Sequence, residues 1–235
     1  MSNLVDMLDS LNDHADVADE SSVIVALLRD VERGVRAIES LESRRATPRD
    51  WIAALAYKGA GGAGSLGAEL TRSAHPASCY KSAADEQTLE ALFPKADRRS
   101  LLCLQAGVYQ IVDFWDESHT AAQAADDLGE SNYSSYWHAI AHRREPDPSN
   151  ARYWLRRAGR HSVFKSVSDH VLKVNWTDAE GREIAPFCGR GGFDPYGFID
   201  FCSRAARSKS LEKPARTIQR LEMLLLLEAT LDSLG

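Results

Sequence analysis

The chain has 235 residues, of which 44% are hydrophobic and 26% charged, a composition typical of globular proteins that argues against wholesale disorder or a fibrous repeat. Its formal net charge of −6 argues against a surface devoted to nucleic acid. Its four cysteines show no CxxC spacing. This pattern fits neither a zinc ribbon nor the disulfide framework of a small secreted domain. An acidic N-terminus and the lack of a long apolar run predict neither a signal peptide nor a membrane span, so we expect a cytoplasmic protein.

Helical periodicity marks the first part of the chain. Apolar residues recur at helical spacing over Val23–Leu41 and predict one long helix. Thr47 and Pro48 supply an N-cap and a first helical position for the next helix. Gly59–Ser65 is glycine-rich like a phosphate-binding loop, but no β-branched strand precedes it and no GK[ST] follows, so we expect a turn. The following stretch, Ser73–Ala84, is expected to be an irregular loop.

The second part of the chain predicts a series of helix pairs. Asp97 can cap a helix whose apolar face continues to Trp115, the next helix should end near Gly129, and Ser134 can cap the one after it. The remaining expected helices are Ser135–Glu145, Pro148–Ala158, Val163–Val174, Pro195–Ala206 and Ala215–Leu234, with a loop from Asn175 to Gly192. The sequence therefore predicts an all-α fold, a compact single domain (1–235) of antiparallel helix hairpins with an N-terminal part (1–96) and a second part (97–235). Tetratricopeptide-like stacking is left open, although no fixed repeat period is found.

The polar segment from Tyr136 to His161 carries the strongest functional signal. His138, His142 and Glu145 follow i, i+4, i+7 spacing, which places them on one face of a helix. Imidazole and carboxylate groups suit zinc or iron(II), and a fourth ligand could come from His119, Asp116 or His161. His138, His142, Glu145 and His161 are also the candidates for acid–base catalysis. The alternative is that the histidine stripe is the solvated face of an amphipathic helix, since the spacing lacks the glutamate of HExxH.

Four arginines on two adjacent helices predict a site for an anion. Paired guanidinium groups can hold a carboxylate or phosphate through two hydrogen bonds, and nearby aromatic rings offer surfaces for stacking. In the alternative, the arginines pair with Glu145, Asp147 and other acids and only stabilise the hairpin. The candidate ligand-binding residues are Gln123, Arg143, Arg144, Asp147, Asn150, Tyr153, Trp154, Arg156 and Arg157.

The segment WHAIAHRREPDPSNARYWLRRAGRH, residues 137–161, resembles the signature of an uncharacterised family of helical proteins of bacteria and fungi, WHxxxHRRExDxxNAxYWxRRxGxH. The resemblance continues more weakly at Leu101, at Asp116–Gln123 and at Asp194–Asp200, and covers about half of the chain. It implies no activity. The charged and aromatic residues of the segment match positions of the family's motif. Asp116, His119 and Gln123 resemble the family as well.

Two functions from different classes follow. The first is a small-molecule-binding protein or enzyme with a His/Glu site, metal-dependent or not, and an arginine-lined site for an anionic ligand. The second is a non-catalytic, helical-repeat-like module that binds a protein partner. The first requires the histidines to face inward toward a concave pocket, and the second requires them to be solvated or fully satisfied by neighbouring side chains. Nucleic-acid binding through the basic hairpin would require affinity that falls steeply with salt, and the acidic net charge argues against it.

Overall fold

The computed structural model describes residues 4–13, 22–60, 66–72 and 78–234. These residues form fourteen helices and one two-stranded sheet, which confirms the expected all-α fold. The helices are α1 (Leu4–Asp13), α2 (Val23–Glu32), α3 (Ala37–Arg44), α4 (Pro48–Ala60), α5 (Cys79–Ser82), α6 (Glu86–Leu92), α7 (Arg98–Ile111), α8 (Trp115–Asp127), α9 (Tyr133–Arg144), α10 (Pro148–Ala158), α11 (Val163–Val171), α12 (Asp178–Ile184), α13 (Pro195–Ala205) and α14 (Lys209–Asp232). The strands β1 (Cys188–Gly189) and β2 (Gly192–Phe193) pair antiparallel. Within these residues, no helix is long and apolar enough to cross a membrane.

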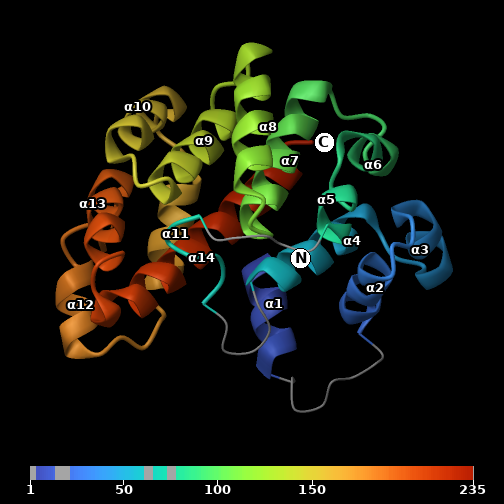
Figure 1. The fold of residues 1–235 in the computed structure, drawn as a ribbon. Helices are drawn as coiled ribbons and strands as arrows, with labels where there is room; N and C mark the ends of the chain where they lie inside the picture. Colours follow the sequence, from blue (N-terminus) through green and yellow to red (C-terminus); the bar gives the residue numbers. More distant parts are fainter. Residues whose placement is uncertain (1–3, 14–21, 61–65, 73–77, 235) are drawn as a thin grey trace.

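The C-terminal helix α14 runs through the middle of the molecule (Figure 1). It packs against α1 and α4 from the N-terminal part and against α7, α11 and α13 from the rest of the chain. Most of its central turns are buried, including the run from Leu221 to Leu227. One cluster of buried apolar residues extends from Leu4 to Leu231, so the hydrophobic core is shared between the two parts expected from the sequence.

Helices α7 to α10 form the layer that carries the polar motif. The helices α7 and α8, α8 and α9, and α9 and α10 are packed neighbours. Asp97 caps α7 by accepting the N–H groups of Arg99 (2.9 Å) and Ser100 (3.2 Å), and Asp147 caps α10, with Pro148 in its first turn. The cap at Asp97 is as the sequence predicted, because an Asp before a helix satisfies its free N–H groups.

Helix α7 approaches α9 closely at Gly107. A Cβ atom at this position would lie 2.7 Å from Cζ2 of Trp137, whose side chain is fully buried. The glycine therefore allows the indole ring to lie directly on the α7 backbone.

The prediction of a single helix over Val23–Leu41 is wrong, because the chain forms the two helices α2 and α3 instead. Gly34 has φ +72°, and the N–H of Gly34 donates to the Val31 carbonyl (2.9 Å) while the N–H of Val35 donates to the Asp30 carbonyl (2.9 Å). This pair of bonds is a Schellman motif, which ends a helix at a glycine in the left-handed conformation. The apolar spacing continues across the break and hides it.

Two boundaries in the motif layer also differ from the expectation. Trp115 begins α8 rather than ending α7, because the chain turns at Asp113, where φ is +69°. Ser134 lies inside α9 and does not cap it. Instead the Glu130 carboxylate accepts the N–H groups of Asn132, Tyr133 and Ser134.

The expected loop at Asn175–Gly192 contains the helix α12, the strand β1 and the start of β2. Thr177 and Glu180 form a capping box at the N-terminus of α12, a signal that the sequence carried. The other expected loop, Ser73–Ala84, contains the short helix α5, while its residues 73–77 lie outside the described residues, as do residues 61–65 of the glycine-rich segment.

Candidate metal centre

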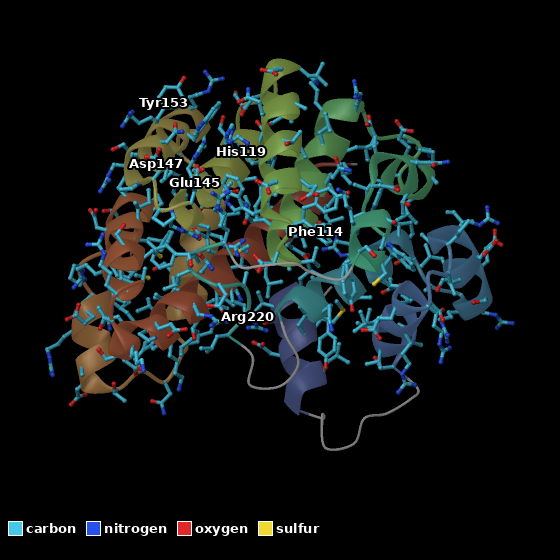
Figure 2. The ribbon with its side chains drawn as sticks, in the orientation of Figure 1. Phe114, His119, Glu145, Asp147, Tyr153 and Arg220 are labelled. Carbon is cyan, nitrogen blue, oxygen red and sulfur yellow. The ribbon has the colours of Figure 1, made fainter. Side chains whose placement is uncertain are left out.

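Two consecutive helices bring three histidines together. His119 lies on α8, and His138 and His142 lie one turn apart on α9. The Nε2 atom of His119 lies 3.0 Å from Nε2 of His138 and 3.3 Å from Nε2 of His142. His138 and His142 are buried and His119 is half-buried, so the histidine stripe of α9 faces inward. Figure 2 shows His119 on the side of α8 that faces the α9–α10 hairpin.

The spacing of these nitrogen atoms fits a bound metal ion. One ligand atom from each histidine lies within 4.8 Å of the others. Zinc–nitrogen bonds of about 2.0–2.1 Å in tetrahedral geometry place two ligand nitrogens about 3.3 Å apart. The three histidines could therefore hold a divalent metal ion with little movement, and three ligands leave one tetrahedral position open.

Carboxylates on the far side of two rings orient the histidines. Nδ1 of His138 lies 3.2 Å from the Asp126 carboxylate, which is itself held by the hydroxyl groups of Ser134 (2.7 Å) and Ser135 (2.9 Å). Nδ1 of His142 lies 3.0 Å from Oε2 of Glu145. A carboxylate at Nδ1 fixes the tautomer that leaves Nε2 free to bind a metal ion. The chain thus has the outer hydrogen bonds that metal-binding histidines usually have.

Flat side chains hold the rings in place. The indole of Trp154 stacks on His138 with ring centroids 3.8 Å apart, and Trp115 stacks on His119 at 5.3 Å. The Trp115 Nε1–H donates to the Ala141 carbonyl of α9 (2.7 Å). Nδ2 of Asn150 lies 3.1 Å from Nε2 of His142, so this amide borders the cluster.

Burial keeps two of the imidazoles neutral. Desolvation, with a smaller contribution from the neighbouring histidines, lowers the pKa of His119 to about 4. Desolvation also lowers the pKa of His142, against the opposing effect of Glu145. Neutral imidazole is the form that binds a metal ion, so these groups need not lose a proton near neutral pH.

The sequence-predicted role of Glu145 as a metal ligand needs correction. Its carboxylate faces Nδ1 of His142 and does not join the three Nε2 atoms. Residues i and i+3 on one helix are neighbours, so the spacing that suggested a shared metal produces a direct pair instead. Asp126, which the sequence reasoning missed, has the same role toward His138. Its signal was the spacing of seven residues from His119, which places both on one face of α8.

The arginines at the end of α9 do not line the cluster. Arg143 is buried and donates to the Glu222 carboxylate on α14 (2.6 Å), and its guanidinium lies over the ring of Phe198. Arg144 is fully buried and binds Asp113, Gln110 and the Glu69 carbonyl. Both guanidinium groups are occupied by the protein's own acceptors, so the predicted anion site at this hairpin is not formed by them.

The other predicted ligand-binding residues are spread over the hairpin. Asn150 and Trp154 contact the cluster, and Asp147 caps α10 by accepting the N–H of Asn150 (3.0 Å). Gln123 donates to Asp127 further along α8 (2.9 Å). Tyr153, Arg156 and Arg157 are exposed on α10. Figure 2 shows Tyr153 at the outer edge of α10.

His161, predicted as catalytic, lies apart from the three-histidine cluster. Its ring contacts the rings of Tyr133, Tyr136 and Phe164. Its Nδ1 accepts the N–H of Val163 at 3.3 Å. The structure therefore places His161 in a separate, aromatic environment at the start of α11.

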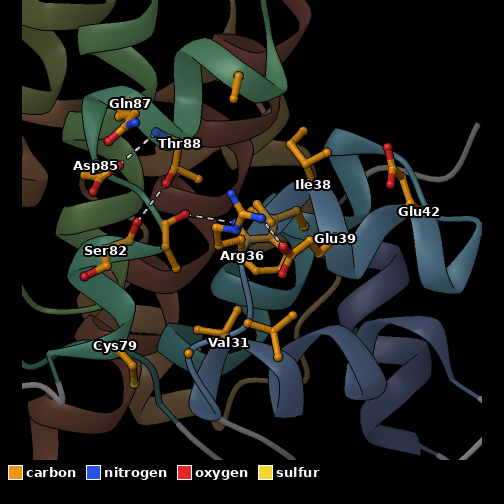
Figure 3. A pocket seen from close by; sticks show the side chains of 16 residues that line it. Val31, Arg36, Ile38, Glu39, Glu42, Cys79, Ser82, Asp85, Gln87 and Thr88 are labelled. Carbon is orange, nitrogen blue, oxygen red and sulfur yellow. Dashed lines mark hydrogen bonds and ion pairs between the residues drawn. The ribbon is translucent and has the colours of Figure 1, made fainter.

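A cavity of about 710 Å³ lies between α2 and α3 on one side and α5 and α6 on the other (Figure 3). None of the sequence-predicted site residues lines it. Among its polar side chains, Arg36 pairs with Glu39 and Asp85 caps α6. Comparisons of the chain with protein-family models, with curated proteins and with solved structures found no match, so the family resemblance of residues 137–161 stays a prediction.

Proposed function

We propose that the protein binds a divalent transition metal ion, zinc in the first place and iron(II) in the second, through Nε2 of His119, His138 and His142. The observation that carries this proposal is the convergence of three Nε2 atoms whose Nδ1 partners include two carboxylates. A stripe of solvated histidines would have no reason to present the same nitrogen of each ring to one point. Neutral imidazoles with an open fourth position are typical of zinc sites that act on a ligand.

In this proposal, the metal site binds a small molecule and does not only stabilise the fold. Structural zinc sites are closed by four protein ligands, whereas catalytic sites keep a position for water or substrate. When bound, a zinc ion would supply Lewis acidity to the group that occupies this position. The chain's own residues hold the rings, cover them with Trp154 and Trp115, and place the amide of Asn150 beside His142.

The test is elemental analysis of protein purified without an affinity tag or chelator. We expect close to one equivalent of metal in the native protein and in His170→Ala, because His170 lies on α11 outside the cluster. We expect His119→Gln to lose the metal while it keeps its helical circular dichroism, since His119 is the half-buried ligand.

Reconstitution with cobalt(II) separates this site from adventitious binding. Tetrahedral coordination by three nitrogen ligands should give visible absorption bands in the native protein that His119→Gln lacks. A protein that neither retains zinc or iron nor takes up cobalt would overturn the proposal and favour the interaction module.

A further inference from the structure

A second cavity, of about 540 Å³, lies where α11 begins and where the β1–β2 hairpin turns. Its charged lining consists of Arg160, Lys165 and Arg190, with Asp169 as the single carboxylate. Lys165 and Asp169 pair with each other at 2.6 Å. Arg160 and Arg190 make no ion pair or hydrogen bond with another described residue, so two positive charges remain at the cavity. This sign is opposite to the net charge of −6 of the whole chain.

The polar groups around this cavity are mostly hydrogen-bond donors. Helix α11 begins here, and its N-cap residue Ser162 does not cap it through its side chain. The N–H groups of Val163 and Phe164 already donate to Nδ1 and to the carbonyl of His161, so this end of α11 favours an anion through the helix dipole. The cavity is also bordered by the glycines of the hairpin. A Cβ atom at Gly189 or Gly191 would meet nothing within 4 Å, so packing does not require glycine at either position. Because glycine has no side chain, both positions leave the cavity open.

A buried imidazole supplies an independent observation. His161 lines the cavity and is 6% exposed. Its Nδ1 accepts the Val163 N–H, which leaves the proton of the neutral ring on Nε2. This Nε2 atom is buried and has no hydrogen-bond partner among the described residues. An unsatisfied buried donor costs free energy, and this one belongs to the ring that borders the cavity.

We propose that this cavity binds a small phosphorylated molecule, with the phosphate group at Arg160, Arg190 and the N-terminus of α11. A phosphate dianion matches two uncompensated guanidinium groups, which hold such oxygens through paired hydrogen bonds. The volume exceeds that of a phosphate ion, and Phe164, Leu172 and Phe193 line the rest of the cavity. The organic part of the ligand packs against these apolar side chains. None of the three clustered histidines lines this cavity, so this inference is independent of the proposed metal site.

The experiment is isothermal titration calorimetry of the full chain at low ionic strength with inorganic phosphate, with glycerol phosphate and with acetate. We expect both phosphate compounds to bind in preference to acetate. Arg160→Gln and Arg190→Gln should each weaken phosphate binding by at least about tenfold, the effect of losing a charge-assisted hydrogen bond. Arg182→Gln should bind as the native protein does, because Arg182 is an exposed arginine of α12 that does not line the cavity.

Nuclear magnetic resonance of the imidazole groups gives a second measurement. Phosphate should shift the Nε2 signal of His161 and leave that of His170 unchanged. If Arg182→Gln weakens phosphate binding as much as Arg160→Gln and Arg190→Gln do, phosphate responds only to the general charge of the surface. That result, or the lack of phosphate binding by the native protein, would overturn the proposal.

Discussion

At the residue scale, Asp126 connects the buried polar network of α8 and α9 to the histidine cluster. Its carboxylate lies beside Nδ1 of His138 and accepts hydrogen bonds from Ser134 and Ser135. Replacing it with asparagine removes the charge that favours the metal-binding tautomer. We predict that Asp126→Asn weakens zinc binding by about 10- to 100-fold, the range for such outer partners, as measured by competition with a chromophoric chelator.

The adjacent residue Asp127 offers a matched control for this experiment. It lies on the same helix, is exposed, and accepts a hydrogen bond from Gln123. Asp127→Asn should bind zinc like the native protein. If both variants lose affinity equally, the effect comes from the charge of α8 and not from the Asp126–His138 pair.

His161 predicts a pH dependence of stability. Burial lowers its pKa to about 4 in the folded chain, against an ordinary value of about 6.5 in the unfolded chain. Between these two values the unfolded chain binds a proton here and the folded chain does not, so the free energy of unfolding falls as the pH decreases from 6.5 to 4. Above pH 6.5 the contribution of His161 to the free energy of unfolding is complete. At pH 4 roughly 3 kcal/mol of this contribution is lost.

The measurement is urea unfolding from pH 7 to pH 4 in the native protein and in His161→Phe. Because the pKa of His119 is also lowered to about 4, both proteins should lose stability, and the difference between the two curves isolates His161. A difference that stays constant across this pH range would contradict the prediction.

At the element scale, a buried ion pair joins α9 to α14. Arg143 and Glu222 are nearly inaccessible to solvent and lie 2.6 Å apart, and the hydroxyl group of Tyr136 also donates to Glu222 (2.9 Å). Removing one partner of a buried pair leaves an uncompensated charge in the core, whereas replacing both partners with apolar residues is often tolerated. The pair therefore makes the arginine structural and not ligand-binding.

We predict that Arg143→Met lowers the free energy of unfolding by about 3–5 kcal/mol and that Arg143→Met/Glu222→Leu recovers part of this loss. Chemical unfolding of both variants and of Glu222→Leu measures the coupling between the two residues. A double variant that loses the sum of both single effects would show that the pair contributes nothing beyond its separate side chains.

Local signals in the sequence predicted most of the helices, while partners distant in the chain were not predictable. The Asp–Pro pairs before α10 and α13 and the Asp before α7 fix helix starts within a few residues. The spacing of His138 and His142 correctly places both on one face of α9, since that relation lies within one helix. Arg143 follows His142 directly, but its role depends on Glu222, 79 residues away, and no local pattern indicates that contact.

At the scale of the whole molecule, α14 couples the N-terminal helices to the motif layer. It packs against α1 and α4 as well as α7, α11 and α13, and the buried cluster that it completes extends from Leu4 to Leu231. Unfolding of either part would expose the apolar side chains of α14 that the other part also covers. The two parts should therefore unfold together.

We predict a single cooperative transition in which the calorimetric and van't Hoff enthalpies agree. Leu55→Ala in α4 should destabilise the chain by about 2–5 kcal/mol, because this side chain is fully buried. It should lower the hydrogen-exchange protection of the slowest amides in α9 by the same free energy as those in α4, although α9 lies in the other part of the chain. If α9 keeps its protection while α4 loses it, residues 1–96 and 97–235 unfold as separate units, and the core contacts of α14 with the N-terminal helices are too weak to couple them.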